Sequence, residues 1–155
     1  MSHVTVWRLC RQPHAIDAFS GEGSRLLGGR WSPVGVRVAY SSESRSLAAL
    51  EVLANLRDSR ILLARPWVMI AATIPLALIE HPARVPDSWR ALPYGSATQT
   101  FGATWLQAGR SAALRVPSTV VLGEFNYLLN PAHPEFGKIK IGRPETFVFD
   151  ERFRT

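Results

Sequence analysis

Polar and apolar residues alternate near the start of the chain, and this alternation predicts a strand over His3–Leu9. Short apolar runs rich in strand-forming residues predict further strands, and a Pro-Ser pair interrupts one stretch of them. Those strands are expected over 36–41, 67–74, 112–116, 119–122, 138–141 and 146–149. The pattern therefore predicts a sheet of about six strands, one of which is bent or broken at Pro117 and Ser118.

Two segments have the spacing of apolar residues that is typical of helices. The first begins at a cap formed by Ser42 or Ser44 and runs to about Arg57. The second covers 96–107 and has Gly109 in the position of a C-terminal cap. Strands and helices do not alternate regularly, so we expect an α+β fold with mixed or antiparallel sheets and few helices.

Two long segments contain many turn-forming residues. Residues 20–35 hold five glycines and one proline, which predicts a shaped loop. Residues 81–96 hold three prolines, which predicts a surface loop. The chain is 155 residues long and shows no internal repeat, so a single domain over 1–155 is expected.

Composition restricts the class of protein. The longest apolar stretch, 67–79, is shorter than the roughly 20 residues of a membrane-spanning helix, and the start of the chain lacks the apolar region of a signal peptide. One cysteine, Cys10, permits no internal disulfide. We expect a cytoplasmic protein without a membrane segment.

The net charge is +6, and 16 of the 18 basic residues are arginines. They form no run along the chain, whereas a nucleic-acid surface usually concentrates its basic residues. We therefore expect no direct binding of nucleic acid by this chain alone.

Glu51 is the first candidate for chemistry. It lies about 40° from Leu47 around the predicted helix, at the border of an apolar arc, and the opposite side of the helix is also apolar. A carboxylate covered in this way needs a partner, because burial otherwise favours its neutral form. A structural salt bridge and a catalytic carboxylate are both compatible with this position.

Four other residues are candidates for ligand binding. Arg30 follows two glycines, which allow a ligand close to the backbone, and its guanidinium can bind a phosphate through two hydrogen bonds. Tyr40 can stack on a planar group or pack in the core. Ser118 and Asn126 can be hydrogen-bond donors or ordinary turn residues.

Other classes of site have weaker support. The four histidines lack the paired spacing of metal ligands, so no metal is predicted. Cys10 adjoins a strand and is expected to be a core residue. The chain contains no GxSxG sequence for a serine hydrolase and no GxxxxGK[ST] phosphate loop.

Several segments, in this order, resemble the RES-domain toxins of bacterial RES–Xre toxin–antitoxin pairs. They are VWRL, SGEGSRLLGGRWSPVG, VAYSS, SLAALEVL, FGATWL, LRVPSTVV, FNYLLNPAHPEF and FVFDERF. The resemblance covers nearly the whole chain. It implies a fold similar to ADP-ribosyltransferases and places the family's site residues on Arg30, Tyr40, Glu51, Ser118 and Asn126.

The resemblance also implies a function. The expected activity is cleavage of NAD+ at its nicotinamide–ribose bond, with NAD+ as substrate, no cofactor, and growth arrest as the result. Hydrolysis is the preferred outcome and phosphorolysis the next. The expected partner is an Xre-type helix-turn-helix antitoxin, and the resemblance allows a homo-oligomer within that complex.

Three alternatives remain open from the sequence. The first is transfer of ADP-ribose to a host protein. The second is a noncatalytic interaction domain, in which the same residues close a buried network. The third is an RNA-cleaving toxin, although the sequence lacks a recognisable His/His or His/Glu pair for that reaction.

Overall fold

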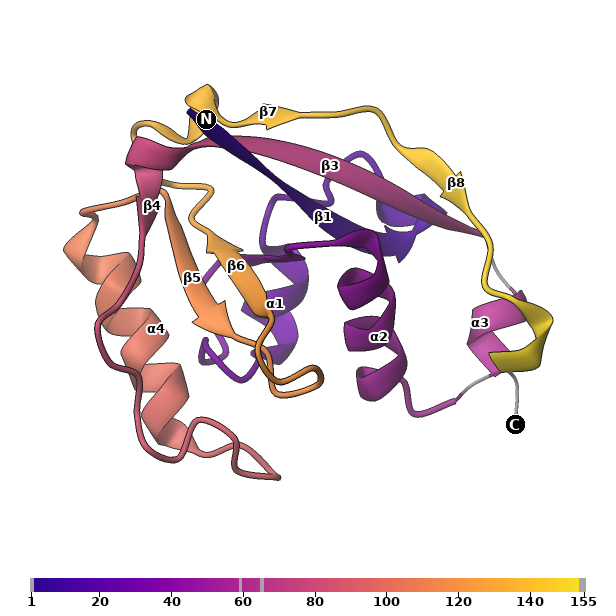
Figure 1. Cartoon of the computed structure of the whole chain (residues 1–155), viewed down its shortest axis with the longest axis horizontal. Coiled ribbons are helices and arrows are strands. Elements are labelled where there is room, and N and C mark those ends of the chain that lie inside the picture. Colours follow the sequence, from indigo (N-terminus) through magenta and orange to yellow (C-terminus); the bar gives the residue numbers. More distant parts are fainter. Residues whose placement is uncertain (1, 59, 65, 154–155) are drawn as a thin grey trace.

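The computed structural model describes residues 2–58, 60–64 and 66–153. Within these ranges the chain forms one eight-stranded sheet and four α-helices (Figure 1). The strands are β1 (His3–Arg11), β2 (Ala39–Ser42), β3 (Trp67–Pro75), β4 (Ile79–Glu80), β5 (Ala113–Pro117), β6 (Phe125–Leu129), β7 (Lys140–Ile141) and β8 (Glu145–Phe147). The helices are α1 (Glu22–Leu27), α2 (Arg45–Asn55), α3 (Arg60–Ala64) and α4 (Ser96–Ala108). This architecture confirms the α+β class.

The sheet consists of two halves that meet at one point. The strand order is β4-β5-β6-β2-β1-β3-β7, with β8 also paired to β3, and β4 and β5 are parallel while the other pairs are antiparallel. β1 pairs with β3 from His3 to Arg11, but it pairs with β2 only through Trp7 and Ser42. The sheet therefore splits between β1 and β2, and this split is visible in the different directions of β1 and β6 in Figure 1.

Helix α2 packs on the half of the sheet that contains β1 and β3. The hydroxyl of Ser44 accepts a hydrogen bond from the Leu47 amide at 3.0 Å, so Ser44 is the N-terminal cap. Ala48 is buried with Leu9 and Met69 in one core cluster. The contact holds the start of α2 against β1 and β2.

Helix α4 covers the other half of the sheet, beside β4 and β5 (Figure 1). Trp105 is buried with Leu114 and Leu128, and Gly109 closes the helix in the left-handed conformation at φ 64°, as its position in the sequence indicates. A β-carbon on Gly102 would overlap the carbonyl oxygen of Trp31. The missing side chain therefore lets α4 touch the 28–32 loop directly.

In the part of the chain that the structure describes, none of the helices has both the length and the apolar character needed to cross a bilayer.

One predicted strand, over 119–122, is wrong. These residues form the turn between β5 and β6, and Leu122 is exposed. The Ser118 hydroxyl accepts hydrogen bonds from the amides of Val120 and Val121, both at 3.1 Å, and thereby captures donors that a strand would use. Gly123, at φ 92°, completes the turn.

Several other expectations differ in detail. The glycine-rich segment 20–35, expected to be a loop, contains α1. Of the two roles left open for Asn126, the structure does not support the turn residue, because Asn126 lies on β6. The strand predicted over 36–41 begins at Ala39, and those predicted over 138–141 and 146–149 are the short strands β7 and β8.

The sequence also suggested that α2 is covered on most sides, and this expectation is wrong. Leu50 is 39% exposed, and Ala54 is exposed as well. The helix contacts the sheet through one side, near Ala48, and its other side remains open. Glu51 is therefore partly accessible from solvent.

We predict that Gly102→Ala destabilises the protein by about 1–3 kcal/mol, because the added methyl group forces α4 away from Trp31. Gly23→Ala is the matched control, since a β-carbon on Gly23 meets no atom within 4 Å and alanine favours a helix. Urea unfolding measures both effects. Equal stability of the Gly102 variant and the wild type would contradict the close packing of α4.

Candidate active site

The carboxylate of Glu51 is the centre of a hydrogen-bonded cluster. Its Oε2 atom accepts a hydrogen bond from Ser118 Oγ at 2.8 Å and another from Asn126 Nδ2 at 2.6 Å. The three residues, far apart in the sequence, are thus brought together as candidates for one site.

Three different elements supply this cluster. Glu51 lies on α2, Asn126 lies on β6, and Ser118 follows the last residue of β5. Ser118 is fully buried, and its hydroxyl also accepts the two amides of the following turn. Because those two contacts use its lone pairs, the hydroxyl hydrogen is directed to Glu51.

Ser42 orients the amide of Asn126 and is an additional candidate site residue, beyond those predicted from the sequence. Its hydroxyl donates to Asn126 Oδ1 at 2.7 Å, which leaves Nδ2 to face Glu51. Ser42 pairs with Asn126 across β2 and β6, so the two side chains share one face of the sheet. Strand alternation could have found it, because Ser42 is two residues after Tyr40.

Tyr40 connects β2 to the loop that carries Arg30. Its hydroxyl oxygen accepts a hydrogen bond from the Trp31 amide at 3.1 Å and shares one of 2.8 Å with Ser32 Oγ. Burial raises the pKa of Tyr40 to about 12, so the phenol is neutral at physiological pH. The hydroxyl group therefore holds the loop, while the ring packs beside Leu128.

Arg30 is held by the segment that the sequence identified only as a surface loop. Its Nη1 atom donates to the carbonyl oxygens of Trp89 and Ala91, each at 2.8 Å, and its guanidinium lies 5.5 Å from the centre of the Tyr94 ring. Nε and Nη2 make no hydrogen bond to any residue that the structure describes. These two nitrogens can bind an anionic ligand.

Arg30 and Glu51 do not touch each other, but their charges interact. Burial lowers the pKa of the Arg30 guanidinium, and the negative charge of Glu51 acts in the opposite direction. The site therefore has a cationic end that suits a phosphate and an anionic end that suits a developing positive charge.

Helix α4 fixes the loop from its other side. Gln99 Nε2 donates to the carbonyl oxygens of Gly29 and Ser32, at 3.1 and 3.3 Å. Gly29 has no room for a side chain, because a β-carbon there would lie 2.7 Å from the Tyr40 hydroxyl. No sequence signal points to Gln99, since one glutamine on an amphipathic helix carries no distinguishing pattern.

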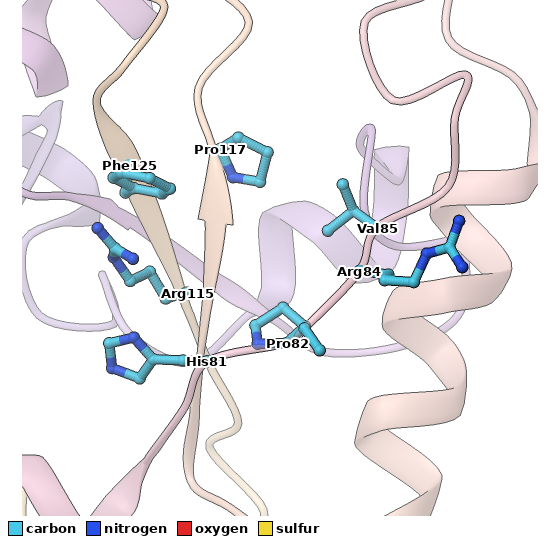
Figure 2. A pocket seen from close by; sticks show the side chains of 8 residues that line it. His81, Pro82, Arg84, Val85, Arg115, Pro117 and Phe125 are labelled. Atoms are coloured by element: carbon cyan, nitrogen blue, oxygen red, sulfur yellow. The ribbon is translucent and has the colours of Figure 1, made fainter.

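A separate pocket of about 180 Å³ lies between β5 and the 81–85 segment (Figure 2). Its lining includes Arg115, His81 and Phe125, and Arg115 lies 3.3 Å from the centre of the Phe125 ring. Side chains alternate along β6, so Phe125 and Asn126 point to opposite faces of the sheet. The pocket is therefore not part of the Glu51 cluster.

No cluster of three or more potential metal ligands occurs among residues 2–58, 60–64 and 66–153. Cys10 is a buried residue of β1 with a free thiol, and burial raises its pKa. The chemical groups that the site itself offers are one carboxylate, one guanidinium, hydroxyls and an amide.

Comparison with known proteins identifies the family. Residues 5–150 match the RES domain family, so the chain belongs to it. It is 36% identical over 154 residues to a protein named Prs ADP-ribosylating toxin from Sphingobium sp. (strain YBL2), with 96% of each chain covered. It is also 33% identical over 152 residues to Toxin Res from Yersinia enterocolitica, covering 97% of this chain and 100% of that protein.

A solved structure supports the fold. The crystal structure of the M. tuberculosis MbcT–MbcA toxin–antitoxin complex contains a chain that matches with a TM-score of 0.75 and 18% identity, covering 94% of this chain and 85% of that one. The resemblance to a RES-domain toxin noted in the sequence is therefore confirmed at the level of family and fold.

We predict that the free energy of unfolding decreases between pH 10 and about 12, because Tyr40 keeps its proton in the folded protein after the unfolded chain has lost it. The contribution is fully present below pH 10, and its loss amounts to about 3 kcal/mol. Urea unfolding of the wild type and Tyr40→Phe over this range isolates it. Parallel pH curves for the two proteins would show that Tyr40 ionises at its ordinary value.

Proposed function

We propose that the chain cleaves NAD+ at its nicotinamide–ribose bond and that Glu51 is the catalytic carboxylate. The supporting observation is the fixed position of this carboxylate, which accepts hydrogen bonds from both Ser118 and Asn126. Ser118 directly follows β5, Asn126 lies on β6, and Glu51 itself remains partly exposed to solvent.

Glu51 would stabilise the ribose during bond cleavage. The bond between the ribose carbon and the nicotinamide nitrogen breaks, its electron pair goes to the nitrogen, and nicotinamide leaves as a neutral molecule. The leaving group needs no proton, so a second acid is unnecessary. The ribose becomes an oxocarbenium-like cation, and the nearby carboxylate lowers its energy.

The other site residues would bind and orient NAD+. Arg30 would hold the pyrophosphate or the ribose through Nε and Nη2, since Nη1 already contacts two carbonyl oxygens. Tyr40 would lie against the nicotinamide or its ribose, with its hydroxyl in the loop. Ser118 and Asn126 would keep Glu51 in place and position the substrate. NAD+ is a substrate here, and we propose that no cofactor takes part.

We further propose that a cognate antitoxin of the Xre helix-turn-helix type restrains this cytoplasmic activity and that DNA binding belongs to the antitoxin. A carboxylate of the partner could occupy the two free nitrogens of Arg30. Exposed apolar side chains near the site, which include Leu50, Val120, Leu122 and Tyr94, offer additional contact area. The structural relative is itself in a toxin–antitoxin complex.

We predict that Glu51→Gln abolishes NAD+ consumption and growth inhibition and leaves the protein folded. The amide keeps the shape of the side chain but has no negative charge to stabilise the cation, and a loss of about 100-fold or more is expected. Loss of NAD+ in a purified reaction is the measurement, with circular dichroism as the test of folding. Glu145→Gln, at an exposed position on β8, is the matched control.

Turnover by Glu51→Gln near the wild-type rate would exclude the catalytic role of this carboxylate. Absence of NAD+ consumption by the wild type, together with intact antitoxin binding, would favour the noncatalytic interaction domain. Incubation of the protein with a labelled RNA, followed by a test for cleavage of that RNA, examines the RNA-cleaving alternative.

Hydrolysis is the expected reaction, with water as the acceptor of the ADP-ribosyl group. Phosphorolysis needs a further cation near Glu51, and the candidates along the chain are Arg25, Arg45 and Arg57. Arg25 forms an ion pair with Glu22, and Arg45 lies 3.7 Å from the centre of the Trp7 ring. Transfer to a protein is the third choice, although one relative is named an ADP-ribosylating toxin.

We predict free ADP-ribose and nicotinamide as the main products, at a rate that does not depend on inorganic phosphate. Phosphorus NMR of the reaction with and without phosphate identifies the product. ADP-ribose 1″-phosphate, formed at a rate that rises with phosphate, would establish phosphorolysis instead. A label that remains on a host protein in a lysate would establish transfer.

A further inference from the structure

Arg8 is a partly buried charged residue outside the site described above. It lies on β1, and its Nη1 atom donates to the backbone carbonyl oxygen of Tyr40 at 2.9 Å. Its Nε atom is buried and has no hydrogen-bond partner among the described residues. Burial of an unpaired donor costs free energy, so a purely structural account of Arg8 is incomplete.

The carbonyl of Tyr40 is available because the sheet splits next to it. In an antiparallel ladder, alternate residues direct both backbone groups to the same neighbouring strand. The Glu43 amide donates to the carbonyl oxygen of Phe125, so the backbone groups of Glu43 point to β6. Because the direction alternates along the strand, the backbone groups of Tyr40 and Ser42 point to β1. β1 reaches β2 only at Ser42, and the guanidinium of Arg8 takes the place of the missing backbone donor.

Tyr40 connects this contact to the Arg30 loop. Its backbone is held by Arg8, and its hydroxyl accepts the amide of Trp31, the residue after Arg30. The phenol ring between these two ends is rigid. A displacement of the Tyr40 backbone therefore moves the hydroxyl that anchors the loop.

We propose that Arg8 is a positioning residue for the NAD+ site, which holds Tyr40 in place and, through Tyr40, sets the position of Arg30. The kinetic consequence rests on the proposed function, whereas the effect on the loop does not. Arg8 does not touch Glu51, so its influence falls on substrate binding at the Arg30 end.

Steady-state kinetics with NAD+ test the first consequence. Arg8→Met keeps an unbranched side chain of similar length but removes the donors, and we expect a rise in KM of about tenfold with kcat within about twofold. Arg30→Lys supplies the reference for a weakened anchor. Arg11→Met is the matched control, because Arg11 is on the same strand and pairs with Trp67, far from Tyr40. A loss in kcat at constant KM, or no change at all, would overturn the proposal.

Amide hydrogen exchange tests the positioning without any enzyme activity. We expect Arg8→Met and Tyr40→Phe each to raise the exchange rate of the Trp31 amide at least tenfold. The double variant should exchange about as fast as either single variant, because both substitutions break the same chain of contacts. Arg8→Lys replaces Arg8→Met if the latter does not fold. Independent, multiplying effects would overturn the proposal.

A uniform rise in exchange throughout the β1–β3 ladder would also overturn it, because Arg8 would then contribute only to stability. If the wild type consumes no NAD+ but the loop responds as expected, the proposed function fails and the positioning role stands.

Discussion

The hydrogen bonds that Ser118 and Asn126 donate to the Glu51 carboxylate depend on the packing of a helix against the sheet and on the pairing of its strands. Glu51 comes from a helix, and its two donors come from the ends of strands that follow much later in the chain. The Ser118 turn, the β2–β6 pairing and the packing of α2 must all be in place before these distances can be met. The candidate site is therefore a product of tertiary structure, since no single segment contains it.

A good part of this arrangement could be predicted from the sequence. The alternation of His3–Leu9 and the apolar run at Trp67 identified the two longest strands, and Ser44 and Gly109 gave helix ends that agree with the structure. These signals are local, because capping and alternation depend on neighbouring residues. The resemblance to a family added the set of site residues, three of which the structure brings into direct contact.

The remainder depends on contacts between distant segments. The strand propensity of 119–122 was misleading because the Ser118 hydroxyl binds the amides of this segment. The roles of Ser42 and Gln99 follow from their hydrogen-bond partners, which are distant in the sequence. Helix α1 lies within a glycine-rich stretch that is typical of loops. A sequence pattern reports on which elements form, and much less on which side chains meet.

The way in which Arg30 is hydrogen-bonded has a consequence for how the sequence around it can change during evolution. The acceptors are the main-chain carbonyl oxygens of Trp89 and Ala91, and every amino acid provides such an oxygen. Substitutions around these positions can therefore alter the outer surface, and with it the choice of partner, while the hold on the guanidinium persists. Insertions and deletions are different, because they shift the register of the carbonyls. Natural variants of this segment should differ freely in composition and very little in length.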